Sequence, residues 1–176
     1  MKEVFVGFAK YNEEANQAVY AILDKLSNDE REKDRGSYYG SLSGLARHLL
    51  GGTIFFGGMF NAVVPGNAAA MKALSALEGL AIPEGKLDES GWKSLGGLFA
   101  AADSALVNFV SALTDGDFKA PLKIDWYGGN PAEVPLYFML QQLAAHGTHH
   151  RGQLSQILDE LKIDNDYSGI NVQFLA

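Results

Sequence analysis

Residues 144–153 read Ala-Ala-His-Gly-Thr-His-His-Arg-Gly-Gln and hold three of the chain's four histidines. Apolar positions recur around this segment at helical spacing: Leu136, Leu140, Leu143, Gly147, His150, Leu154, Ile157 and Leu161. Such a period predicts an amphipathic helix from Leu136 to Leu161. His150 falls on its inward stripe, His146 lies one turn earlier on the same side, and His149 lies toward the flank. Two imidazoles spaced i, i+4 on one helical face can bind a single metal ion.

A single histidine on an apolar face is more often a satisfied core residue than a ligand. Burying two imidazoles side by side costs free energy of desolvation, unless another group binds their lone pairs. No acidic residue lies near His146 or His150 in the sequence. Metal binding and simple burial therefore both remain open for this pair, and a third ligand from elsewhere would favour the metal.

Three further amphipathic helices are predicted, and together with the last one they indicate an all-α four-helix bundle. The first runs from about Phe5 to Ser27, the second starts near Ser37 and extends toward Met59, and the third spans Leu95 to Leu113. A short extra helix is expected over Ala68 to Leu77. At 176 residues the chain is expected to form one domain, residues 1–176.

The connection before the last helix, Phe118 to Pro135, is long and contains several prolines and glycines. The alternation from Leu122 to Trp126 predicts a short strand or an extended flap, with no sheet larger than a small hairpin. A long connection of this kind is often a lid or a substrate wall. The end of the chain, Ile170 to Ala176, is expected to be an extended tail.

The second helix supplies the fourth histidine. Its predicted inward side carries Ser41, Gly44, Leu45, His48, Gly52, Phe55 and Met59. The bundle would bring His48 toward His146 and His150, and three neutral imidazoles leave a coordination position for water or substrate. Glycines in a helix cost stability, which is tolerable where backbones approach closely or a pocket needs room.

Two asparagines of the first helix, Asn12 and Asn16, fall on or beside its inward stripe. A buried amide needs hydrogen-bond partners. We expect a contact between helices, and keep a role near the site or in a ligand pocket as the second interpretation. The charged runs at residues 13–14 and 29–35 are interpreted as solvated surfaces.

Composition limits the function further. The formal net charge is −7 and no cluster of basic residues offsets it, which argues against nucleic-acid binding. The chain has no cysteine, so it can form no disulfide and supply no thiolate of its own. The apolar tract from Leu49 to Val64 is too interrupted by glycines to span a bilayer, and the N-terminus resembles no signal peptide. We therefore expect a cytoplasmic protein without a membrane partner.

Three segments resemble the DinB/YfiT-like family. His146 to Gln153 is similar to the family's last-helix signature, Tyr11-Asn12 with Ala15-Asn16 to its opening motif, and Gly36 to Leu49 to its second helix. The resemblance implies a four-helix bundle with an unusual chain order, a homodimer, and a divalent ion held by His48, His146 and His150. It leaves His149 outside the ligand set. Glu14 stands where the family's opening motif commonly has an aromatic residue.

The resemblance also suggests a chemistry. Relatives include thiol-dependent S-transferases, such as bacillithiol transferases, and a mycothiol-dependent maleylpyruvate isomerase. It therefore implies a small-molecule electrophile as substrate and an external low-molecular-weight thiol. Zinc or nickel is the expected ion, with iron or copper as alternatives.

Two other functions stay open from the sequence: a metal-dependent hydrolase of a small molecule, and a non-catalytic metal-stabilised binding or dimerisation module. A peptidase is disfavoured, because Gly147 stands where H-E-x-x-H enzymes keep their general base. A di-iron carboxylate bundle is disfavoured because paired Glu-x-x-His motifs are absent from the sequence.

Overall fold

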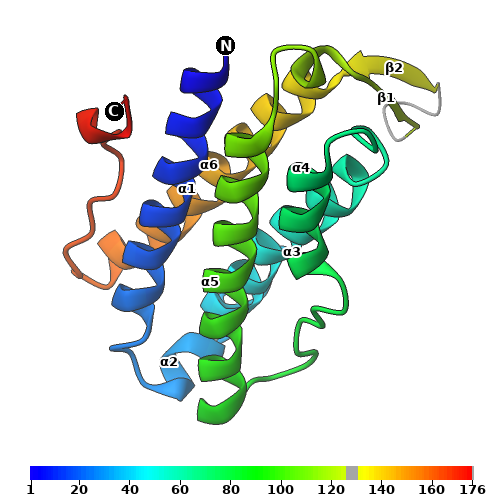
Figure 1. Ribbon diagram of the computed structural model, residues 1–176. Helices are drawn as coiled ribbons and strands as arrows, with labels where there is room; N and C mark the ends of the chain where they lie inside the picture. Colours follow the sequence, from blue (N-terminus) through cyan, green and yellow to red (C-terminus); the bar gives the residue numbers. More distant parts are fainter. Residues whose placement is uncertain (126–130, 176) are drawn as a thin grey trace.

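The computed structural model of the protein describes residues 1–125 and 131–175. Four long helices form the molecule: α1 (Lys2–Leu23), α3 (Leu42–Phe60), α5 (Glu89–Ala112) and α6 (Leu136–Glu160) (Figure 1). Shorter elements connect them: α2 (Asn28–Glu32), α4 (Ala68–Leu74) and the 3-10 turns Ser75–Leu77 and Asp117–Lys119. A further 3-10 turn, Val172–Leu175, follows α6. The predicted all-α bundle is confirmed, including the extra helix at α4.

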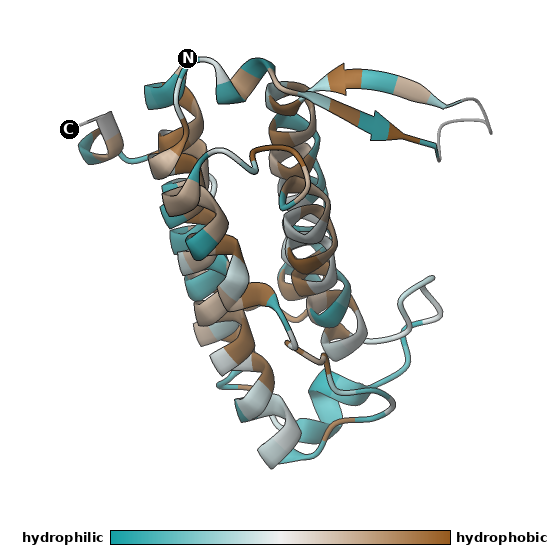
Figure 2. Cartoon of the chain, turned by 45° about the vertical axis from the view of Figure 1, so that its right-hand side comes forward, coloured by the Kyte–Doolittle hydropathy of each residue, from teal (hydrophilic) through white to brown (hydrophobic). Residues whose placement is uncertain are grey.

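Each long helix packs against two of the other three. Helix α1 packs against α5 and α6, and α3 packs against the same two helices. Buried apolar residues of all four long helices form one core, and the ribbon of each helix alternates between hydrophobic and hydrophilic colours (Figure 2). The ligand-bearing helices of the predicted site, α3 and α6, are therefore direct neighbours.

Helix starts follow from their capping residues. The Ser41 hydroxyl accepts a hydrogen bond from the Gly44 amide at 3.1 Å, and the Asp88 carboxylate accepts one from the Gly91 amide at 2.7 Å. These side chains satisfy amides that have no partner within the helix. The cap at Ser41 explains why α3 begins at Leu42 rather than near Ser37 as predicted.

The predicted hairpin is present before the last helix. Strands β1 (Pro121–Ile124) and β2 (Ala132–Pro135) pair antiparallel, with Leu122 opposite Val134. Leu122 and Ile124 are buried, as their alternation indicated. The predicted end of that strand, Trp126, lies outside the described residues.

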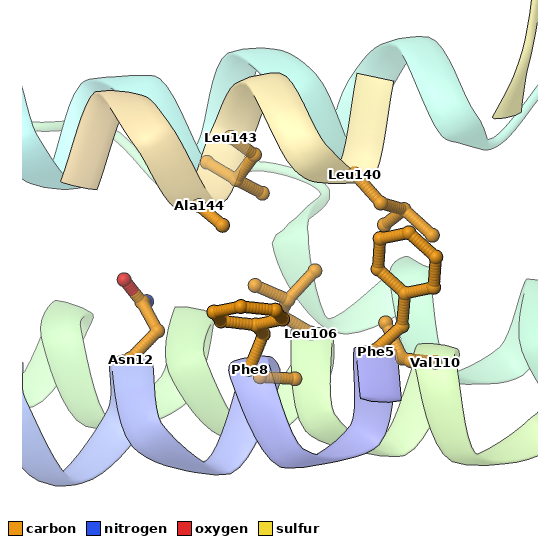
Figure 3. Close-up of a pocket in the computed structure, with 9 residues that line it drawn as sticks. Phe5, Phe8, Asn12, Leu106, Val110, Leu140, Leu143 and Ala144 are labelled. Carbon is orange, nitrogen blue, oxygen red and sulfur yellow. The ribbon is translucent and has the colours of Figure 1, made fainter. Parts of the chain in front are cut away.

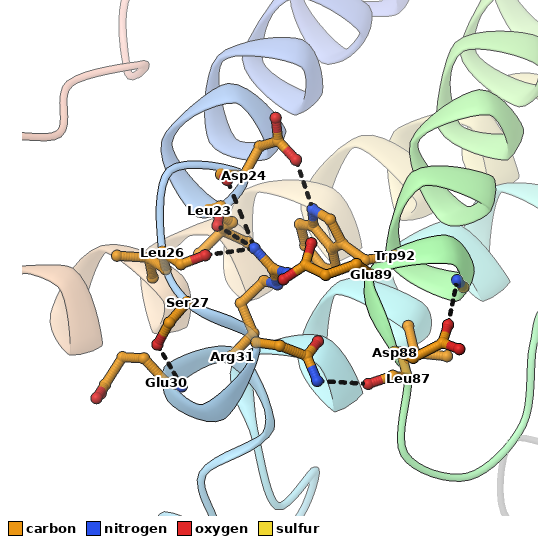
Figure 4. Close-up of polar contacts among 12 residues, drawn as sticks. Leu23, Asp24, Leu26, Ser27, Glu30, Arg31, Leu87, Asp88, Glu89 and Trp92 are labelled. Atoms are coloured by element: carbon orange, nitrogen blue, oxygen red, sulfur yellow. Dashed lines mark hydrogen bonds and ion pairs between the residues drawn. The ribbon is translucent and has the colours of Figure 1, made fainter.

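The charged run at residues 29–35 departs from prediction. Helix α1 ends at Leu23, and Arg31 of α2 is only 1% exposed. Its guanidinium donates to the Leu26 carbonyl at 2.5 Å and to Glu89 of α5 at 2.5 Å, and lies 4.7 Å over the ring of Trp92 (Figure 4). The expectation that residues 29–35 are all solvated is wrong at Arg31. This side chain joins the end of α1 to the start of α5.

Two smaller expectations also need correction. Phe55, predicted on the inward side of the second helix, is 56% exposed, whereas Phe56 is 6% exposed. Nearly every side of α3 carries apolar residues, so periodicity did not define its buried face. The tail is not fully extended either, because it contains the 3-10 turn Val172–Leu175. Phe174 of this turn packs in a cluster with Tyr11 and Ala15 of α1.

Among the described helices, α5 alone is long and apolar enough to cross a membrane by length and composition. In this structure it packs against α1, α3 and α4, and it contributes Trp92, Leu95, Phe99 and Phe109 to the core. Its apolar composition is that of a helix at the centre of a bundle.

Candidate metal centre

Three histidines from two neighbouring helices meet through their Nε2 atoms. The Nε2 atom of His48 on α3 lies 3.0 Å from the Nε2 atoms of both His146 and His150 on α6. One ligand atom from each of the three rings lies within 4.8 Å of the other two. The i, i+4 spacing in α6 places two rings on one face, and the packing of α3 adds the third. The predicted convergence of these three residues is confirmed.

The distances between these atoms suit a divalent ion. Donors about 2.0 to 2.1 Å from an ion are separated by about 2.9 Å at right angles and about 3.3 Å in a tetrahedron. Both separations measured from His48 fall within this range. The two separations that involve His48 therefore suit one ion bound between α3 and α6.

Gln153 orients the ring of His150. Its Oε1 atom lies 2.7 Å from Nδ1 of His150, and an amide oxygen only accepts hydrogen bonds. Nδ1 therefore carries the proton in the neutral ring, and the lone pair of Nε2 points into the cluster. Partners of this kind fix the tautomer of metal-binding histidines.

The electrostatic environment keeps the rings neutral. Burial, and then the neighbouring histidines, lower the pKa of His146 to about 4. Burial followed by the charge of His150 lowers the pKa of His48, and burial also lowers the pKa of His150 against the opposing effect of Gln153. A neutral imidazole is the form that binds a metal. The lone pairs of the neutral rings are thus available to bind a metal cation, and the lowered pKa values disfavour their protonation.

Gly52 makes room for one of these rings. A Cβ atom at this position of α3 would lie 2.3 Å from Cε1 and 2.7 Å from Nδ1 of His146. Contacts this short do not occur between unbonded atoms, so only glycine allows the ring of α6 to lie against the backbone of α3. The glycine-rich composition of this helix has a local purpose here, as the sequence suggested.

A tyrosine that the sequence did not single out makes a further polar contact with the cluster. The hydroxyl of Tyr39 lies 2.9 Å from Nε2 of His48, and the two rings stack with centroids 4.2 Å apart. Tyr39 and His48 also line an open surface pocket of about 510 Å³ together with Arg47, Ile82, Pro83 and Glu84. This pocket exposes Tyr39 and His48, at one edge of the cluster, to solvent.

His149 is outside the cluster. Its side chain is exposed and lines an apolar groove between α1 and α6, with Phe8 and Thr148. A separate cavity between α1, α5 and α6 is lined by Phe8, Leu106 and Asn12 among others (Figure 3). Its volume is about 20 Å³, which is space for about one water molecule. This cavity is a packing gap and too small for a substrate.

Asn12 and Asn16 of α1 take part in a buried polar network that includes Arg151 of α6. Their Nδ2 atoms donate to Asp103 of α5 at 3.1 and 3.0 Å, and their Oδ1 atoms accept from Arg151 at 2.7 and 2.9 Å. These bonds make the expected contact between helices, because they join α1 to α5 and α6. Gly147 permits the approach, since a Cβ there would lie 2.7 Å from the Asn12 oxygen.

Asp103 was missed by the sequence reasoning. It is 1% exposed, and burial raises its pKa to about 8. Hydrogen bonds from the two asparagines and the charge of Arg151 act in the opposite direction. A signal was available, because Asp103 follows Phe99 by four residues and so falls on the apolar stripe of its helix.

The family profile of the DinB family matches residues 1–161. The chain belongs to the DinB family. Neither the curated proteins nor the solved structures yielded a match to this chain. Family membership agrees with the helical fold and with the three-histidine cluster, and the substrate has to be argued from the chemistry of the site.

Proposed function

We propose that this protein is a metal-dependent enzyme that binds a divalent ion through His48, His146 and His150. The observation that carries the proposal is the convergence of three neutral imidazoles on one point, with His150 oriented by Gln153. Zinc and nickel suit an all-imidazole set, and iron and copper are the alternatives. When bound, such an ion lowers the pKa of a thiol or water attached to it.

The reaction we propose is S-transfer from an external low-molecular-weight thiol to a small electrophile. The thiol sulfur forms a bond to the electrophilic carbon, the leaving group departs with its electron pair, and the thiol proton passes to solvent. The chain has no cysteine, so the sulfur nucleophile has to come from outside. The pocket beside His48 gives a small molecule access to the cluster, and family membership supports this chemistry.

Residues of the chain would act around this step by binding and orientation. The pocket contains one cationic side chain, Arg47, whose guanidinium donates to the Pro83 carbonyl at 3.3 Å. Glu84 lies on the same rim, so the entrance carries both signs of charge. Burial lowers the pKa of all three rings, which favours the neutral form that binds a metal.

The test begins with metal analysis of the protein as purified. His48→Ala and His150→Ala should each abolish tight binding of one divalent ion per chain, whereas His149→Ala should retain it. Equal loss in all three variants would contradict the assigned ligands. Their folding is checked by circular dichroism, which should remain dominated by helix.

The reaction is tested by turnover of an electrophile with and without an added thiol, on metal-loaded and chelated protein. Turnover that needs both thiol and metal supports S-transfer. Metal-dependent turnover in water alone would favour a hydrolase instead. Tight metal binding without turnover of a broad panel would favour the binding or dimerisation module.

We also propose that the protein forms a homodimer. Support comes from an apolar groove between α1 and α6 and from the exposure of Val4 (55%) and Phe8 (38%) beside it. Sedimentation of the wild type and of a Val4→Glu, Phe8→Glu variant tests this, since the charged variant should be monomeric. A wild-type monomer would refute the dimer and leave the metal assignment untouched.

A further inference from the structure

A fourth polar atom lies about as close to Nε2 of His48 as the nitrogens of the two other histidines do. The hydroxyl oxygen of Tyr39 is 2.9 Å from Nε2 of His48, while the two other histidine nitrogens are 3.0 Å from that same atom. Donors around one ion are separated by about 2.9 to 3.3 Å when each lies about 2.0 to 2.1 Å from it. The oxygen thus stands at a ligand-to-ligand distance from His48.

The structure holds Tyr39 firmly in this place. Ser37 and Gly40 form an isolated β-bridge around it, and Gly40 adopts a φ of 72°, a left-handed conformation that glycine adopts without strain. A Cβ atom on Gly44 would lie 2.0 Å from the Tyr39 carbonyl oxygen, so a glycine lets this turn sit against the start of α3. The backbone that carries the tyrosine is therefore packed against the helix that carries His48.

The ring of Tyr39 is fixed as well. It stacks on His48 at 4.2 Å with an interplanar angle of 27°, and meets His150 edge-on at 5.3 Å. Its neighbour Tyr38 is 95% exposed and packs only edge-on against Tyr39 among the ring contacts of the described residues. Of these two adjacent tyrosines, one is directed into the histidine cluster and the other into solvent.

We propose that Tyr39 supplies a fourth donor, its phenolic oxygen, to the divalent ion held by His48, His146 and His150. This inference rests on the proposed metal site and extends it to a set of three nitrogens and one oxygen. Binding of the oxygen releases the phenol proton to solvent, so the charge of the site falls by one. Imidazole with oxygen suits zinc, nickel, iron and copper. The pocket that Tyr39 and His48 line would give a small molecule access to this ion.

The experiment uses copper(II) as the probe, because phenolate bound to copper(II) absorbs visible light and imidazole alone does not produce that band. The wild type and Tyr38→Phe, loaded with one copper(II) per chain, should show the band. Resonance Raman excitation within it should enhance ring vibrations of a coordinated phenolate. Tyr39→Phe should lose both signals and bind copper(II) at least tenfold more weakly. It retains the ring that stacks on His48, so folding, checked by circular dichroism, should be unchanged.

Three kinds of result overturn the inference, and they can be told apart. One copper(II) per chain with spectra that are identical in the wild type and Tyr39→Phe would exclude the tyrosine while preserving the three-histidine site. Absence of stoichiometric copper(II) from the wild type, or binding unaffected by His48→Ala, would refute the metal site and the tyrosine ligand together. A band that persists in Tyr39→Phe but vanishes in Tyr38→Phe would show that Tyr38, and not Tyr39, supplies the oxygen.

Discussion

Replacement of Gly52 by alanine should damage the metal site while leaving the bundle folded. The added Cβ would lie 2.3 Å from Cε1 of His146, where ordinary contact begins at 3.4 Å. The ring has to move by about 1 Å, because packed interiors leave little space for the methyl group. Metal–ligand distances tolerate deviations of only about 0.2 Å. His146 would therefore be lost as an aligned ligand.

Two opposing effects set the stability of this variant. Alanine favours the helix over glycine by about 1 kcal/mol, and overpacking in a filled interior costs about 1 to 3 kcal/mol. The net loss is thus about 0 to 2 kcal/mol, which a folded domain can absorb. Zinc affinity should fall at least about tenfold. This is the lower end of the loss in metal affinity that follows when the residues that position a ligand are changed.

A matched control comes from the same helix. At Gly58 of α3 an added Cβ has nothing within 4 Å, so Gly58→Ala gains helix propensity without a clash. Its melting temperature without metal should rise by about 2 to 4 °C. Zinc affinity is measured by competition with a chromophoric chelator on both variants. Equal affinities for Gly52→Ala and Gly58→Ala would refute the idea that the missing side chain makes room for the ligand ring.

Three further predictions concern other contacts of the bundle. Gln153→Ala should weaken zinc binding about tenfold by releasing the ring of His150, whereas Gln156→Ala on the exposed side of α6 should not; a chelator competition that ranks the two alike would contradict this role. The pKa of Asp103, about 8 in the folded state, lies above its ordinary value, so the folded chain keeps a proton that the unfolded chain loses. The stability from that proton is fully present below about pH 4 and is lost as pH rises toward about 8. The free energy of unfolding of the wild type, relative to Asp103→Asn, should therefore decline over that interval in urea titrations, and a constant difference would refute the raised pKa. Arg31→Met should destabilise the protein by about 2 to 3 kcal/mol in thermal unfolding, because buried carbonyl groups at the end of α1 lose their donor; a loss under about 0.5 kcal/mol would show that this arginine is dispensable.

The parts of the site that follow from helical spacing were predictable. His146 and His150 share a face because they are four residues apart, and a bundle brings neighbouring helices together over their apolar sides. The inward placement of Asn12 and Asn16 follows from the same period. These inferences depend on local geometry, which one sequence contains.

The parts that failed depend on which surfaces meet. Arg31 belongs to a run of charges typical of a solvated surface, and only the corner between α1 and α5 buries it. Phe55 lies on a helix that is apolar on nearly all sides, so its period gave no unique inward direction. Asp103 finds its partners 87 and 91 residues away, and Tyr39 precedes the helix whose histidine it touches. Tertiary packing decides each of these.

The chain distance between the ligands has a mechanical consequence. His48 is separated from His146 and His150 by 98 and 102 residues. An ion bound by all three would act as a cross-link that closes a loop of about 100 residues, and a covalent link of that span limits the unfolded chain by about 4 to 5 kcal/mol in a chain-entropy treatment. A chain without cysteine cannot make such a link by oxidation. Its resistance to unfolding would then vary with the supply of metal, and a chelator would act on this protein as a reductant acts on a disulfide-bonded one.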